Sequence, residues 1–231
     1  MYRLKKLKIL FVLSLVINLL LIGVGSFIVN KQGGMAAVKS YFSSDQYTDY
    51  YLHKKRLFES FDYDKVDKVF LGDSITDHGE LQTYFPGEVV VNRGIVDDET
   101  KGVLNRIDEV VKRNPKEVYI LIGINDIGEE VDLDVYQKNM EKIIQSFDTK
   151  KTKVIVQSIL PVNNKEFRNT ISNDTVDQFN EALQKLAEEN GVQYVNLNQH
   201  FETADGQLKK EFTVDGVHLS DEGYDMWMEN L

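Results

Sequence analysis

Two short segments, far apart in the sequence, hold residue types that could carry out nucleophilic catalysis. Ser74 closes the segment Gly72-Asp73-Ser74, which directly follows the apolar run Val69–Leu71. Asp215 and His218 stand three residues apart near the other end of the chain. A serine hydroxyl becomes an effective nucleophile when an imidazole takes its proton, and a carboxylate can hold that imidazole in the required tautomer. The pattern predicts Ser74 as nucleophile, His218 as base and Asp215 as orienting acid.

The elements that must position these residues alternate along the chain. Apolar runs, read as strands, alternate with amphipathic helices, which is typical of a parallel sheet covered by helices on both faces. The predicted strands are Val66–Leu71, Val89–Asn92, Val118–Ile122, Val154–Gln157 and Gln193–Leu197. The predicted helices are Ser44–Phe61, Asp98–Lys112, Leu133–Phe147, Asp174–Asn190 with Asn173 as its N-cap, and a short helix from Ser220. Ligands of such sheets bind beyond the carboxyl ends of the strands, so we expect the site at that edge.

Two further segments follow predicted strands, Asn92-Arg93-Gly94 after the second and Gly123-Ile124-Asn125-Asp126 after the third. With Gly72-Asp73-Ser74 and Asp215-Gly216-Val217-His218 they form an ordered set that resembles the blocks of the SGNH hydrolases, also called the GDSL esterase/lipase family. The resemblance covers roughly Val66 to Tyr224. It implies a three-layer α/β/α, flavodoxin-like SGNH fold with a central parallel sheet of about five strands.

The resemblance also implies a set of donors for the oxyanion of a tetrahedral intermediate. They are the backbone N–H of Ser74, the backbone N–H of Gly94 and the side-chain amide of Asn125. Taken singly, each of these residues could serve an ordinary turn, because short matches are common. Asp73 and Asp126 are expected to order their loops by hydrogen bonds. No metal or organic cofactor is implied, and no Gly-x-Ser-x-Gly elbow surrounds Ser74, which argues against the α/β-hydrolase fold.

The first thirty residues are predicted to lie outside the globular fold. Residues 9–29 form a run of 21 residues without a charge, long enough as a helix to cross a bilayer of about 30 Å. Four basic residues precede the run and only Lys31 follows closely, which places the N-terminus in the cytoplasm and the rest outside. We expect an uncleaved, single-pass signal anchor in the cell membrane. The alternative is a cleaved signal peptide and a secreted protein.

The expected organisation has three parts. Residues 1–31 form a basic cytoplasmic tip and the transmembrane helix, residues 32–63 a juxtamembrane tether and helix, and residues 64–231 the SGNH hydrolase domain. The part after residue 31 holds 22 basic and 37 acidic residues, a net charge of −15. Such an acidic domain is a poor partner for nucleic acid or other polyanions.

These features together predict an extracytoplasmic serine esterase that forms an acyl-enzyme on Ser74. The expected substrate is a small carboxylic ester, acetyl above all, and from the location an O-acylated glycan of the cell surface. Three alternatives stay open. The chain could be an O-acetyltransferase for cell-wall polysaccharide, which would need a membrane partner to supply acetyl groups. It could be a lysophospholipase or thioesterase. It could also be a non-catalytic surface module with a relic of the triad.

Overall fold

The computed structural model describes residues 8, 11–12, 14–18, 23, 47–61 and 65–231. They belong to two compact units, Met1–Thr48 and Asp49–Leu231. The predicted membrane-spanning segment, residues 9–29, lies largely outside the described residues. Among those that are described, no helix has both the length and the apolar composition that crossing a bilayer requires. The predicted boundaries after residues 31 and 63 also fall outside the described ranges, so this division remains a prediction.

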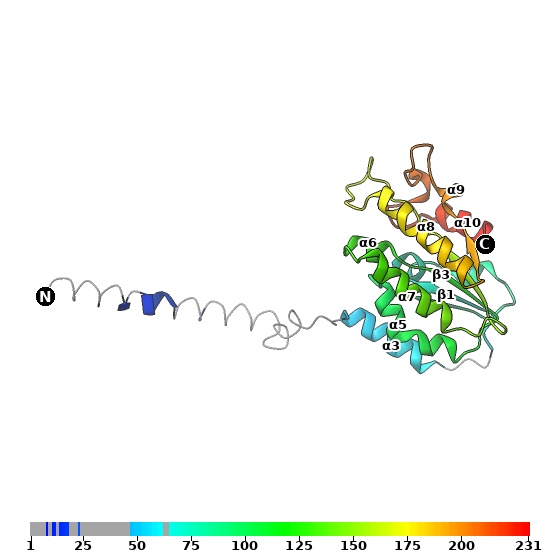
Figure 1. Ribbon diagram of the computed structural model, residues 1–231, viewed down its shortest axis with the longest axis horizontal. Helices are drawn as coiled ribbons and strands as arrows, with labels where there is room; N and C mark the ends of the chain where they lie inside the picture. Colours follow the sequence, from blue (N-terminus) through cyan, green and yellow to red (C-terminus); the bar gives the residue numbers. More distant parts are fainter. Residues whose placement is uncertain (1–7, 9–10, 13, 19–22, 24–46, 62–64) are drawn as a thin grey trace. The chain divides into compact units, whose positions relative to one another are not determined.

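The second unit is built on one five-stranded, wholly parallel sheet in the order β2-β1-β3-β4-β5. Figure 1 shows two of its strands, β1 and β3, among the helices. The strands are β1 Lys68–Gly72, β2 Val90–Gly94, β3 Glu117–Leu121, β4 Lys153–Gln157 and β5 Gln193–Val195. All five predicted strands are confirmed, with ends displaced by no more than two residues. The three central strands β1, β3 and β4 are near-continuous apolar runs because they are buried on both faces, as expected for parallel strands between helices.

The helices follow the predicted alternation. They are α3 Asp49–Ser60, α4 Ser74–Asp77, α5 Thr100–Val111, α6 Ile124–Gly128, α7 Leu133–Gln145, α8 Asn173–Glu189, α9 Asn198–Phe201 and α10 Asp221–Glu229, with 3₁₀ turns η1 Leu81–Tyr84 and η2 Lys210–Phe212. The predicted N-cap of α8 is wrong by one residue. Ser172 is the N-cap, and the Asn173 side chain instead accepts from the Val162 N–H at 2.8 Å.

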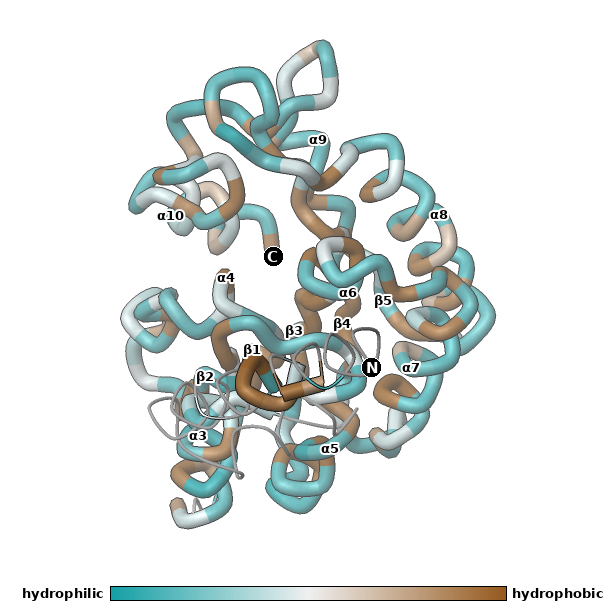
Figure 2. The backbone as a smooth tube through the Cα atoms, turned by 90° about the vertical axis from the view of Figure 1, so that its left-hand side faces the viewer, coloured by the Kyte–Doolittle hydropathy of each residue, from teal (hydrophilic) through white to brown (hydrophobic). Residues whose placement is uncertain are grey.

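Two hydrophobic layers cover the two faces of the sheet because successive strand residues point to opposite sides. Val69 and Leu71 pack with residues of α5, α7 and α8, whereas Phe70 packs with residues of η1, α9 and α10. In Figure 2 the outer loops and much of the helices are teal, whereas brown, apolar positions lie near the labels β3 and β4 in the interior. The result is the predicted three-layer α/β/α arrangement.

Helix α3 is fastened to this unit by buried groups of α5 and β2. The Tyr51 hydroxyl donates to the Gly102 carbonyl at 2.7 Å. The Arg113 guanidinium donates to the Phe58 carbonyl at 2.7 Å, and the Arg93 guanidinium lies 4.5 Å from the centre of the Phe58 ring. These contacts hold α3, which lies within the predicted helix Ser44–Phe61, against the helices and strands of this unit.

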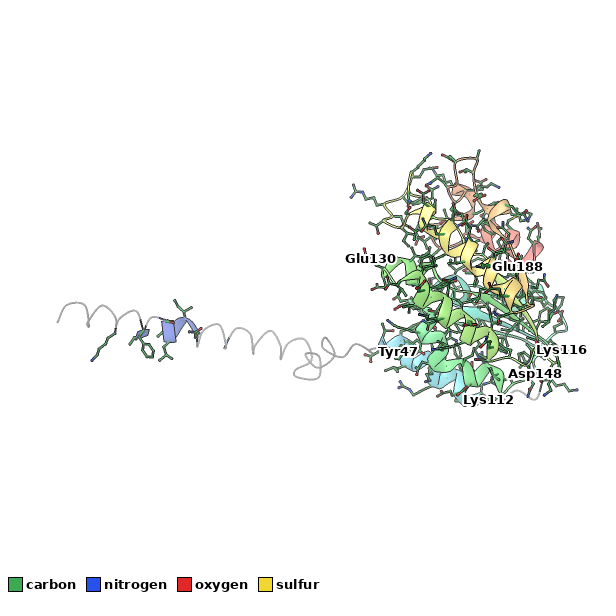
Figure 3. All side chains as sticks on the ribbon, in the orientation of Figure 1. Tyr47, Lys112, Lys116, Glu130, Asp148 and Glu188 are labelled. Carbon is green, nitrogen blue, oxygen red and sulfur yellow. The ribbon has the colours of Figure 1, made fainter. Side chains whose placement is uncertain are left out.

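The strand order reverses at the carboxyl edge between β1 and β3, which is where parallel α/β sheets form ligand sites. The register aligns Gly72 with both Gly94 and Leu121, so β1, β2 and β3 end at the same level. Lys116, which precedes β3, lies at the opposite end of the unit from Glu130, which follows α6 (Figure 3). The residues that follow β1, β2 and β3 therefore meet at one edge.

The packing of α3 predicts unequal costs for two truncations on this helix. Phe58 is 7% exposed, whereas Leu57 is 37% exposed. Phe58→Ala should lower the free energy of unfolding by about 3–5 kcal/mol, since it empties a buried site, and Leu57→Ala by less than about 1 kcal/mol. Urea denaturation measures both. Equal, small losses would show that α3 does not belong to the folding unit.

Candidate active site

Ser74 is the first residue of α4 and follows β1 after a single intervening residue, Asp73. Asp73 is the N-cap of α4, and its Oδ1 accepts the Ile75 N–H at 3.0 Å. Helix N-caps of this kind satisfy one of the donors that the first turn leaves free. The cap confirms the expectation that Asp73 orders the turn, and it fixes where the Ser74 side chain begins.

The turn also needs Gly72, because the backbone approaches its neighbours too closely for a side chain. A Cβ at this position would lie 2.2 Å from the Thr76 Oγ1 and 2.3 Å from the Leu121 carbonyl oxygen. The second of these is backbone of β3 and cannot rotate away. Gly72 therefore lets the strand end and the start of α4 lie against β3.

The structure brings Ser74, His218 and Asp215 together in one hydrogen-bond chain. The His218 Nε2 lies 3.0 Å from the Ser74 Oγ, and the His218 Nδ1 lies 2.6 Å from the Asp215 Oδ2. The Ser74 residue is 4% exposed, whereas the side chains of His218 and Asp215 are 31% and 51% exposed. The chain therefore runs from a buried hydroxyl to a solvent-accessible carboxylate.

Several hydrogen bonds hold Asp215 in this orientation and keep it ionised. Partial burial would raise the pKa of Asp215, but hydrogen bonds from the His218 side chain and from the backbone N–H groups of His218 and Val217 outweigh it and lower the pKa. The Asp215 Oδ1 accepts those two N–H groups at 2.8 and 3.0 Å. One carboxylate oxygen thus shapes the loop while the other receives the imidazole.

The loop that carries Asp215 and His218 is closed at its base. Thr213 and Leu219 form an isolated antiparallel bridge, and the Thr213 Oγ1 donates to the His218 carbonyl at 2.7 Å. Gly216 has φ +94°, and a Cβ there would lie 2.7 Å from the Phe167 Cβ. A glycine is required because both the backbone conformation and the space exclude a side chain. The closed loop is what brings the base to a strand end 144 residues earlier.

Two of the three predicted oxyanion donors retain a free N–H at this edge. The Asn125 Nδ2 donates one hydrogen to the Asp98 carbonyl at 2.9 Å, which leaves the second amide hydrogen without an acceptor among the described residues. The N–H of Ser74 stands at the first position of α4, where no intrahelical acceptor exists.

The prediction that the Gly94 N–H is an oxyanion donor is wrong. This N–H donates to the Asn92 Oδ1 at 2.8 Å and is not available to an oxyanion. A Cβ at Gly94 would lie 2.1 Å from the Asp77 N, so this glycine lets α4 pack on the end of β2. The Asn92 Nδ2 completes the join by donating to the Thr76 and Gly79 carbonyls at 2.5 and 2.9 Å.

A donor that sequence reasoning missed lies three residues further along. Asp97 is exposed and has φ +60°, and its N–H has no acceptor in the part of the chain that the structure describes. Its neighbours are held on both sides, because the Val96 N–H donates to the Asp77 Oδ2 at 3.3 Å and the Asp98 carbonyl accepts from Asn125. Nothing in an acidic run Asp97-Asp98-Glu99 signals this left-handed conformation, since it is rare outside glycine.

Three carboxyl groups are buried beneath the edge. Burial, followed by the nearby carboxylates of Asp98 and Asp126, raises the pKa of Asp73 to about 7. Burial raises the pKa of Asp98 to about 6 despite the Arg106 guanidinium, whose Nε lies 2.9 Å from the Asp98 Oδ2. Burial likewise raises the pKa of Asp126 to about 6, although Thr100 donates to it through both its N–H and its hydroxyl. Asp126 therefore holds the start of α5, whereas the prediction was that it orders its own loop.

A second histidine lies beside the proposed base. The ring of His78, an exposed residue that follows α4, lies with its centroid 5.2 Å from that of His218 and borders the base. Within the described ranges, no three histidine or carboxylate side chains gather in an arrangement that could hold a metal ion.

A parallel sheet in this order, with a serine, histidine and aspartate hydrogen-bonded at its carboxyl edge, defines a flavodoxin-like α/β protein with a hydrolase-type site. The model of the GDSL-like lipase/acylhydrolase family matches residues 70–226, more than half of the chain. The chain belongs to this family. The predicted enzyme class, a hydrolase acting on ester bonds, is confirmed at that level.

Several individual proteins are similar to this chain. A Streptococcus pneumoniae structure, provisionally described as a platelet activating factor, is 34% identical with a TM-score of 0.72 and covers 78% of this chain and 89% of its own. The acetylxylan esterase of Geobacillus stearothermophilus is 28% identical over 168 residues, 58% of this chain and 76% of the esterase. The N-acylneuraminate cytidylyltransferase of Streptococcus agalactiae serotype V is 25% identical over 162 residues, 70% of this chain, but the chain spans only 37% of that relative's length.

The buried carboxyl groups predict a pH-dependent stability. A group whose pKa is raised on folding stabilises the native state below its ordinary value, about 3.9 for aspartate, and loses that contribution as the pH rises through the folded value. For Asp73 the loss extends to about pH 7. Between pH 5 and 8 the free energy of unfolding should therefore fall more in the wild type than in Asp73→Asn, whose Oδ1 can still accept the Ile75 N–H. Urea titrations at pH 5 and pH 8 measure this difference. An equal change in the free energy of unfolding in both proteins would contradict the raised pKa of Asp73.

Proposed function

We propose that Ser74, His218 and Asp215 form a catalytic triad that hydrolyses carboxylic esters. The observation that carries the proposal is the continuous hydrogen-bond chain from the Asp215 Oδ2 through both ring nitrogens of His218 to the Ser74 Oγ. These three side chains lie at the carboxyl edge of the sheet, where parallel sheets bind ligands. Family membership supports the same reaction class.

The geometry supports a two-step acyl transfer. The Ser74 Oγ attacks the acyl carbon while its proton passes to the His218 Nε2, which then protonates the departing alcohol oxygen. Water, deprotonated by the same nitrogen, attacks the acyl-enzyme and releases the acid and the Ser74 hydroxyl. Asp215 holds the Nδ1 proton and stabilises the imidazolium that forms in each step.

The oxyanion of each tetrahedral intermediate needs donors directed at it. The Ser74 N–H and the second amide hydrogen of Asn125 are two of them. In place of Gly94 we propose the N–H of Asp97, because it is unpaired among the described residues and its two neighbours are tied to α4 and to Asn125.

Three substitutions at Asp97 separate its N–H from its backbone conformation. Asp97→Gly relieves the left-handed conformation and keeps the N–H, so kcat should stay near that of the wild type. Asp97→Val strains the conformation but keeps the donor, and Asp97→Pro strains it and removes the donor. Loss of one oxyanion donor lowers kcat by about 10²–10³-fold, so Asp97→Pro should fall well below Asp97→Val. Equal kcat values for the valine and proline variants would remove Asp97 from the donor set.

The substrate we propose is a short acyl ester, acetyl above all, carried by a glycan. The partial exposure of the His218 and Asp215 side chains supports this, because it is compatible with a bulky alcohol group beside them. The similarity to an acetylxylan esterase points to the same substrate class. The proposed reaction then releases acetate and a free sugar hydroxyl.

We also propose that the chain acts outside the cytoplasm and is held in the membrane by residues 9–29. The support is the uncharged run of 21 residues with its basic N-terminal flank. A glycan of the cell surface would be within reach of an enzyme held there.

A chain-length series of p-nitrophenyl esters tests the proposed reaction on the full-length protein. Activity should be highest on acetate and butyrate, and Ser74→Ala should lower kcat by at least about 10³-fold, since it removes the nucleophile. His218→Ala should be similarly inactive, and a fluorophosphonate probe should label Ser74 in the wild type only.

Other outcomes decide between the alternatives. Activity that rises steadily toward C12 esters would favour a lysophospholipase or thioesterase. Diversion of acetyl groups from water to an added glycan acceptor would favour an O-acetyltransferase. Equal inactivity of folded wild type and Ser74→Ala, without labelling, would leave the relic interpretation.

A further inference from the structure

Helix α3 reaches the helix that carries the proposed nucleophile. The Tyr50 hydroxyl donates to the Asp77 Oδ2 at 2.6 Å, and the Lys54 ammonium pairs with the Asp77 Oδ1. Asp77 is the last residue of α4, which begins at Ser74, and its side chain is only 4% exposed. A carboxylate this buried needs strong partners, and α3 supplies two.

The same carboxylate holds the loop that follows β2. The Asp77 Oδ2 accepts the Val96 N–H at 3.3 Å, and Val96 directly precedes Asp97, the proposed oxyanion donor. On the other side of Asp97, the Asp98 carbonyl accepts from Asn125. The residues on either side of the proposed donor are therefore hydrogen-bonded to side chains, Val96 to Asp77 of α4 and Asp98 to Asn125 of α6.

The tie at Asp77 adds a side-chain constraint to the backbone hydrogen bond that the Ile95 N–H donates to the Gly72 carbonyl at 3.2 Å, and both hold the proposed oxyanion donor near the nucleophile. Ser74 and Asp77 belong to one short helix, so a group held by Asp77 is held in the frame of Ser74. Misplacement of a reacting or stabilising group by about 1 Å can lower a rate by up to about 10²-fold. The long bond from Val96 alone would be a weak constraint, and the partners on α3 are what keep the carboxylate turned toward it.

We propose that Asp77 is a positioning residue. Held by Tyr50 and Lys54 of α3, it positions residues Val96–Asp98, which include the proposed oxyanion donor, against α4 and its first residue, Ser74. The inference rests on the proposed function. It makes α3 part of the catalytic apparatus, although this helix precedes residues 70–226, the span that the family model matches.

The Tyr50 hydroxyl keeps its proton at neutral pH. Burial, together with the hydrogen bond to Asp77 and the charge of Asp77, raises the pKa of Tyr50 to about 12. The Tyr50 hydroxyl therefore stays protonated and donates throughout neutral pH. Lys54 also lies 5.2 Å from the centre of the Phe58 ring, a cation–π contact that directs its ammonium along α3.

The test compares kcat, KM and the rate of fluorophosphonate labelling in full-length variants. Asp77→Ala should lower kcat on p-nitrophenyl acetate by about tenfold or more with KM changed less than about threefold, because transition-state stabilisation is lost while substrate binding is kept. Labelling of Ser74 should slow by a similar factor. Asp77→Asn, which can still accept from Tyr50 and Val96, should recover part of the loss, and Tyr50→Phe should lower kcat by about two- to fivefold.

Lys55→Met is the matched control. Lys55 is the neighbour of Lys54 on α3, but its ammonium donates to the Asn105 carbonyl at 2.8 Å, away from Asp77. Lys55→Met should leave kcat and the labelling rate unchanged. If α3 only packs on the domain, its variants should change the melting temperature, and no variant should lower kcat more than the others.

The outcomes are decisive even where one variant fails to fold. If Asp77→Ala is unfolded, Asp77→Asn and Tyr50→Phe decide, and wild-type kcat in both overturns the proposal. A loss in Lys55→Met equal to that in Tyr50→Phe, or a change in KM alone, also overturns it. If the wild type hydrolyses no ester, the proposed function fails, but the labelling rates still test Asp77. Absence of labelling in the wild type removes both.

Discussion

The site depends on the close approach of the Ser74 turn to the end of the sheet. At Gly72 a Cβ would lie 2.3 Å from the Leu121 carbonyl oxygen, and at Gly94 it would lie 2.1 Å from the Asp77 N. These two positions face each other in register across β1 and β2. Because neither has a side chain, α4 can lie directly on both strand ends. Any larger residue would push α4 outward and move the Ser74 hydroxyl away from the His218 imidazole, which lies only 3.0 Å from it.

This packing forces charge into the interior, and arginines offset part of it. Arg106 lies under the turn, where it pairs with Asp98 and also donates to the Gly72 carbonyl at 3.1 Å. Further along α5, the Glu109 carboxylate lies between Arg93 and Arg113, at 2.7 and 2.9 Å. Buried pairs of this kind add little net stability, but breaking one is costly because a charge is left unpaired. Loss of Arg106 would therefore leave the buried Asp98 carboxylate without its arginine partner, close to the strands that carry the site.

The sequence predicted the parts of the molecule that depend on apolar periodicity. Central strands such as the run Val118–Ile122 follow from burial on both faces, and the five longer helices of the catalytic unit follow from apolar residues at helical spacing. The meeting of Ser74 with Asp215 and His218 was predicted from residue types and order. The short helices α4 and α6 were not, since four or five residues carry no period. Gly94 was misassigned because glycine is compatible both with close packing and with substrate access, and only the structure shows which applies.

The oxyanion donors are harder to predict than the nucleophile and base because they depend on more segments of the chain. The Ser74–His218 pair joins only two segments, a strand end and a loop closed on itself by Thr213. The proposed donors come from three segments, and their relative positions depend on side-chain ties. Asn92 joins β2 to α4, Asn125 joins α6 to the loop before α5, and each tie is a single amide. Such ties leave no trace in periodicity or spacing, because one side chain can reach any backbone group within about 3 Å of its tip. The accuracy of the site therefore depends on polar side chains such as Asn92 and Asn125, which lie within the family's blocks but form bonds that the blocks do not reveal.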